Sequence, residues 1–144
     1  AASAAEAGME IEVIREPKDG YWSNVWNNDA KGWCACYWGG RPAETMMFSA
    51  AYVAESKWND TMWKTTDSAV KFNQLVKDAR KELDESKKRD ILYECQRLIY
   101  DDGGLLCPLF NSYVSANSKK IAHGKIAANW DSDGAKCAER WWFA

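Results

Sequence analysis

Residues 68–104 read SAVKFNQLVKDARKELDESKKRDILYECQRLIYDDGG and predict two consecutive amphipathic helices. Apolar side chains at helical spacing predict a first helix over 68–83, with Asp67 or Ser68 as its N-cap. A second apolar stripe predicts a helix over 85–102, which ends at a Gly-Gly pair. The two stripes consist of Phe72, Leu75, Val76, Ala79 and Leu83, and of Ile91, Cys95, Leu98 and Ile99. The pair predicts a helical hairpin that covers a sheet.

Three stretches outside the hairpin have the pattern of β-strands. Met9–Arg15 alternates β-branched and charged residues, and Gly32–Trp38 alternates aromatic and small ones. Leu105–Ala116 predicts a third strand, in which Pro108 removes a backbone donor and favours a sheet edge or a bulge. We therefore expect an α/β fold in which a small mixed sheet is covered by the two long helices.

Shorter helices are predicted elsewhere in the chain. The opening AASAAEAG is typical of the last turns of an Ala-rich helix closed by Gly8, which indicates a fragment of a longer protein. A short helix from Asp19 places Trp22 and Trp26 on one face. Another is expected around 43–52, and a last one near Asp133.

Size and charge restrict the class of protein. The chain has 144 residues, enough for one domain, and 19 Lys and Arg against 21 Asp and Glu give a net charge of −2. This balance lacks the basic surface that nucleic acids or anionic membranes require, so we expect no nucleic-acid partner. No apolar run approaches the roughly 18 to 20 residues that cross a bilayer.

The cysteines and the single histidine form no recognisable reactive or metal-binding motif. Cys34 and Cys36 are a C-x-C pair rather than a redox C-x-x-C, and we expect them to be free, buried structural thiols. The remaining cysteines and His123 have no paired spacing, so no metal ligands are predicted. His123 lies in a predicted turn without a nucleophile motif, and we assign no catalytic residue and no cofactor.

The tryptophans and one arginine carry the strongest functional signal. The chain has nine Trp, of which Trp38, Trp58 and Trp63 lie in or near a long irregular segment, where a core role and a cleft-wall role are both open. Arg41 follows Trp38 after two glycines, so a ligand could approach backbone and guanidinium together. The alternative for Arg41 is a surface salt bridge to Glu44.

Three stretches together carry a family resemblance. These are WCACYWGGRPAETMMFS, WNDTMWK and the helix pair followed by LLCPLF. The chain resembles the C-terminal lobe of the family 5 extracellular solute-binding proteins of ABC importers, the peptide, oligopeptide or nickel type. The resemblance covers nearly the whole chain and implies a partial lobe of the type II periplasmic binding protein fold over 1–144, without the N-terminal lobe and the signal peptide.

The resemblance implies capture of a small solute between two lobes in the periplasm and delivery to a membrane permease, without catalysis. Peptide binders of this family place an aspartate shortly after a tryptophan that resembles Trp38, whereas this chain has Arg41 there. A cation would repel a peptide amino terminus, so we expect an anionic or polyhydroxylated ligand, such as an opine-like or sugar-acid conjugate. The candidate ligand-binding residues are Trp38, Gly39, Gly40, Arg41, Trp58, Asn59, Phe110 and Trp130.

Two other functional classes remain open from the sequence. One is a stand-alone thiol redox domain that uses Cys34 and Cys36. The other is a carbohydrate-binding module built on the aromatic residues, which would bind glycans without a second lobe.

Overall fold

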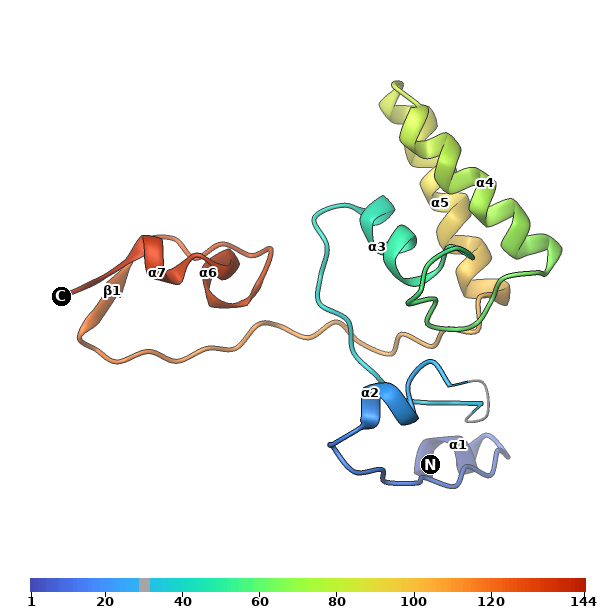
Figure 1. The fold of residues 1–144 in the computed structure, drawn as a ribbon, viewed down its shortest axis with the longest axis horizontal. Helices are drawn as coiled ribbons and strands as arrows, with labels where there is room; N and C mark the ends of the chain where they lie inside the picture. Colours follow the sequence, from blue (N-terminus) through green and yellow to red (C-terminus); the bar gives the residue numbers. More distant parts are fainter. Residues whose placement is uncertain (29–31) are drawn as a thin grey trace. The chain divides into compact units, whose positions relative to one another are not determined.

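The two long helices form the hairpin that the sequence predicts, and Figure 1 shows them side by side. Helix α4 spans Asp67–Lys81 and α5 spans Glu85–Asp102. Thr66, one residue before the predicted caps, is the N-cap of α4, and its hydroxyl accepts from the Ala69 N–H at 3.2 Å. Asp84 caps α5 by accepting from two backbone N–H groups, at 2.9 and 3.0 Å.

The core lies where this hairpin meets helix α3 (Glu44–Ala51), close to the predicted 43–52. Phe72 is fully buried and packs edge-on against Phe48, with ring centroids 5.6 Å apart. Leu83 is wrong as a core residue, because α4 ends before it and its side chain is 91% exposed. The buried cluster comprises Phe48, Ala51, Tyr52, Val53, Trp63, Ala69, Phe72, Val76, Cys95, Leu98 and Ile99.

A second set of contacts ties the two ends of the hairpin together. The Asp102 carboxylate, at the end of α5, accepts hydrogen bonds from Trp63 Nε1 at 3.0 Å and from the Thr66 hydroxyl at 3.1 Å. The Ser68 hydroxyl also donates to it. These bonds, the one from Ser68 foremost, hold the pKa of Asp102 below its ordinary value. Trp63 is therefore a core residue whose indole N–H is satisfied, which settles the choice that the sequence left open.

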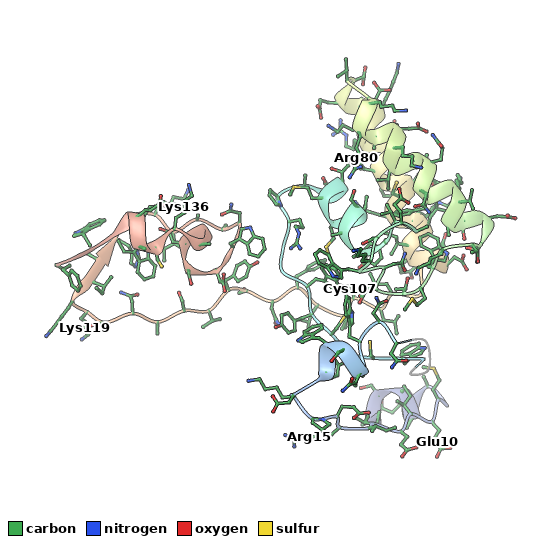
Figure 2. The ribbon with its side chains drawn as sticks, in the orientation of Figure 1. Glu10, Arg15, Arg80, Cys107, Lys119 and Lys136 are labelled. Atoms are coloured by element: carbon green, nitrogen blue, oxygen red, sulfur yellow. The ribbon has the colours of Figure 1, made fainter. Side chains whose placement is uncertain are left out.

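The predicted three-stranded sheet is wrong. The structure is a computed structural model that describes residues 1–28 and 32–144, and in these residues only β1 (Ile121–His123) and β2 (Trp141–Phe143) pair, as an antiparallel two-stranded sheet. Met9–Arg15, Gly32–Trp38 and Leu105–Ala116 have no regular secondary structure. A strand is stable only when it pairs with another strand, and none of these described segments does so. Figure 2 shows Cys107 on the extended run that follows α5.

The chain divides into two units, Ala1–Cys36 and Tyr37–Ala144. The first contains α1 (Ala2–Glu6) and α2 (Tyr21–Asn24), near the two places where short helices are predicted. Gly8 has a φ of 77°, as expected for a glycine that follows a helix. Trp22 and Trp26 are neighbours as predicted, with ring centroids 5.6 Å apart.

The C-terminal part of the second unit is built around β1 and β2. Between them lie α6 (Asp131–Ala135) and α7 (Cys137–Arg140). The terminal helix, predicted from near Asp133 through the stretch AKCAERWW, is shorter than predicted, because Trp141 begins strand β2. The turn α6 has left-handed dihedral angles, with φ of 50° at Ser132, 60° at Asp133 and 69° at Gly134.

The described residues thus form a small mixed α/β protein that is mostly helical. In this part of the chain, none of the helices has the length and apolar character needed to cross a membrane.

Candidate ligand site

The stretch from Trp38 to Arg41 leads into α3 without regular structure, and its arginine folds back on its own backbone. Arg41 Nη1 donates to the carbonyl oxygen of Gly39 at 2.7 Å and to that of Gly40 at 3.3 Å. The side chain is half-buried. These two bonds fix the orientation of the guanidinium plane relative to the main chain.

Two indole rings lie against this guanidinium. Arg41 Cζ is 5.9 Å from the ring centroid of Trp38 and 5.4 Å from that of Trp130, within the range of cation–π interactions. Trp38 also packs against the hydrophobic core, so its position is set by the helical part of the unit. Trp130 comes from the loop before α6, far away in the sequence.

Gly39 permits the close approach of Trp130. A Cβ atom at this position would lie 3.2 Å from Trp130 Cζ3, which is closer than ordinary van der Waals contact. It would also lie 3.5 Å from Arg41 Nη1. The backbone N–H of the next residue, Gly40, donates to the hydroxyl of Tyr113 at 3.2 Å. Tyr113 was not among the predicted site residues, and only its place in an aromatic, β-like stretch hints at a role.

We name Trp38, Gly39, Gly40, Arg41, Tyr113 and Trp130 the Arg41 cluster. The predicted alternative, a salt bridge from Arg41 to Glu44, is not formed, and among residues 1–28 and 32–144 no carboxylate pairs with Arg41. The cluster is therefore a cationic site with aromatic surfaces beside it.

The other three candidate residues lie elsewhere in the second unit. Asn59 is 1% exposed and belongs to the core, where its Nδ2 donates to the carbonyls of Tyr52, Val53 and Trp63 at 3.0, 3.2 and 3.3 Å. These bonds give Asn59 a structural role. The side chain of Trp58 is 57% exposed and that of Phe110 is 95% exposed, and no described contact joins either of them to the Arg41 cluster.

Asp133, which the sequence analysis named only as the expected start of a helix, organises the segment that carries Trp130. Its buried carboxylate accepts from the Ala127 N–H at 2.6 Å and from Trp141 Nε1 at 3.0 Å, and it pairs with Arg140 at 3.1 Å. These interactions, the Ala127 bond foremost, hold the pKa of Asp133 below its ordinary value. The D-x-D-G sequence is typical of a turn and was the only signal for this role.

The thiols do not follow the prediction of burial. Cys34 and Cys36 form no disulfide with another described cysteine, but both are exposed, because the predicted strand that would bury them does not form. Cys95 is buried. Its burial, and to a smaller extent the nearby charge of Glu94, raises the pKa of its thiol to about 11.

His123 lies against Trp141, with ring centroids 5.0 Å apart, so it has a packing role.

Two shallow depressions lie on the helical part, and neither includes the Arg41 cluster. One of about 290 Å³ lies beside Ser49, Asn73 and Arg80, and Figure 2 shows Arg80 on α4. The other, of about 480 Å³, lies beside Glu44 and Tyr93. In the part of the chain that is described, no three His, Cys, Asp or Glu side chains gather as metal ligands.

Comparisons with protein-family models, with curated proteins and with solved structures return no match.

Proposed function

We propose that this chain is part of the C-terminal lobe of a bilobal, periplasmic solute-binding protein, the substrate-binding component of an ABC importer. Its role is to hold a small polar or anionic solute for delivery to a membrane permease, without making or breaking a bond. The observation that carries the proposal is that five of the eight candidate residues, Trp38, Gly39, Gly40, Arg41 and Trp130, come together in one cluster.

The chemistry of the cluster supports binding of an oxygen-rich or anionic solute. A guanidinium offers up to five N–H donors and suits carboxylates and other polar groups. The indoles of Trp38 and Trp130 add apolar surface next to this charge, the combination typical of small-molecule sites. An opine-like or sugar-acid conjugate fits this chemistry better than the amino terminus of a peptide, which Arg41 would repel.

The extended segments also support a longer protein with a second lobe. Leu105–Ala116 is largely exposed and without a partner strand in the described residues, although it carries apolar side chains such as Leu106, Phe110 and Val114. Exposed, unpaired segments of this kind are rare in complete soluble proteins because they promote aggregation. They are expected in a lobe whose sheet is completed by strands from other parts of the same protein.

The test compares this chain with the product of the complete reading frame that encodes it. A thermal-shift screen with dipeptides, opines and aldonic acids, followed by calorimetry, should give one ligand bound by the complete protein at micromolar affinity or tighter. The chain 1–144 alone should bind that ligand no tighter than about millimolar, near −4 kcal/mol, because half of the buried surface is missing. Micromolar binding by the isolated chain would contradict the proposal, since the whole site would then lie within these residues.

The two other classes make different predictions in the same experiments. A thiol redox domain would show a disulfide between Cys34 and Cys36 that forms and breaks with the redox poise of the buffer. A stand-alone carbohydrate-binding module would bind glycans as the isolated chain, without a second lobe.

A further inference from the structure

After its contacts with the described residues, the guanidinium of Arg41 keeps one edge, Nε–Nη2, on which a ligand could accept two hydrogen bonds. Nη1 is engaged by the carbonyls of Gly39 and Gly40 at 2.7 and 3.3 Å. In the described part of the chain, no acceptor hydrogen-bonds to Nε or to Nη2 of this residue. The Nε–Nη2 edge is one of the two sides on which a guanidinium binds a carboxylate with two parallel hydrogen bonds.

The structure holds this edge in a fixed orientation. The bonds to Gly39 and Gly40 anchor the guanidinium, and the Gly40 N–H is itself held by Tyr113 at 3.2 Å. Contacts with Trp38 and Trp130 further limit the rotation of the side chain. An arginine restrained in this way loses little conformational entropy when it binds a ligand.

We infer, on the basis of the proposed function, that the solute carries a carboxylate group, and that Arg41 binds it in bidentate fashion through Nε and Nη2. Charge favours an anion, because among the described residues no carboxylate neutralises Arg41. The two parallel donors of the Nε–Nη2 edge match the two oxygens of a carboxylate. The faces of the neighbouring indoles are electronegative, so the additional oxygens of a phosphate would be repelled where they approach Trp38 or Trp130.

The test is an NMR titration of the ¹⁵N-labelled chain 1–144 with three probes at matched ionic strength. These are propionate, its neutral isostere propionamide, and inorganic phosphate. The signals followed are Nε–Hε of Arg41, Nε1–Hε1 of Trp38 and Trp130, and Nε–Hε of Arg89, an exposed arginine on α5 that serves as an internal control. Propionate should shift the Arg41 signal saturably, with a Kd in about the millimolar range, and leave Arg89 unshifted.

Two variants separate a specific site from a general salt effect. Arg41→Gln should weaken propionate binding, followed through the Trp38 and Trp130 signals, by at least about ten-fold, whereas Arg89→Gln should leave it unchanged. Equal shifts with propionamide and propionate, or larger saturable shifts with phosphate, would overturn the inference of a carboxylate and leave the cluster as a solute site. No saturable shift of Arg41, Trp38 or Trp130 with any probe would overturn both the inference and the role of the cluster in the proposed function.

Discussion

Replacement of Asn59 distinguishes a core residue from a ligand-binding one. Its amide donates to three backbone carbonyls, while its own Oδ1 is buried without a hydrogen-bond partner among the described residues. Asn59→Ala removes two N–H donors, each worth about 1 kcal/mol net, and adds a desolvation penalty of about 1–3 kcal/mol for carbonyls left unpaired. Loss of the unpaired Oδ1 offsets part of this cost. We therefore expect the variant to lose about 2–4 kcal/mol of unfolding free energy.

Asn59→Asp keeps the shape of the side chain but replaces the donor by a carboxylate oxygen that faces three carbonyl oxygens at 3.0–3.3 Å. Burial and these carbonyls would raise the pKa of the new carboxyl, so the variant should regain stability as the pH falls through that raised pKa. The measurement is urea unfolding followed by circular dichroism at 222 nm. Trp58→Ala, next to it and exposed, is the matched control and should change stability by no more than about 0.5 kcal/mol. Wild-type stability in both Asn59 variants would refute the structural role of Asn59.

Two further predictions concern titratable groups. Hydrogen bonds from Arg97 and then Lys71 lower the pKa of Glu94 to about 2. Glu94 should therefore contribute stability that is present above its ordinary pKa of 4.5 and is lost as the pH falls toward 2, and Glu94→Gln should flatten this part of the pH–stability curve measured by urea unfolding. The buried Cys95 thiol, with a pKa raised to about 11, should react with Ellman's reagent at pH 8 only on unfolding, while the exposed Cys34, Cys36 and Cys107 react in the native protein. Rapid native labelling of Cys95 would show that the core around it is open.

The helices could be predicted from the sequence because their signals are local. The apolar stripes of 68–83 and 85–102 and the Gly-Gly stop act within a few residues of one another. The resulting α4 differs from the prediction by one residue at its start and two at its end, and α5 has the predicted bounds. The strands could not, because the alternation in Met9–Arg15 and Leu105–Ala116 indicates a strand only if a partner is present.

The candidate site was predictable in part. Trp38 and Arg41 are close in sequence, and the two glycines between them predicted room for a ligand; in the structure the indole of Trp130 packs against Gly39. The contact itself depends on long-range packing that no local pattern specifies. Asn59 was misleading for the same reason, since a polar residue in a turn-like W-N-D-T stretch gives no sign that its amide is buried against three carbonyls.

Whether Arg41 selects the ligand is decided by Arg41→Ala in the complete protein, titrated with its ligand by calorimetry. Loss of a ligand-paired arginine costs about 2–5 kcal/mol of binding, so affinity should fall by at least about 30-fold. Arg41→Lys should recover only part of this loss, because an ammonium cannot form the bidentate pair, and Arg89→Ala should have no effect. Unchanged affinity in Arg41→Ala, with the helical circular dichroism intact, would contradict the account and restore a peptide amino terminus as a candidate ligand.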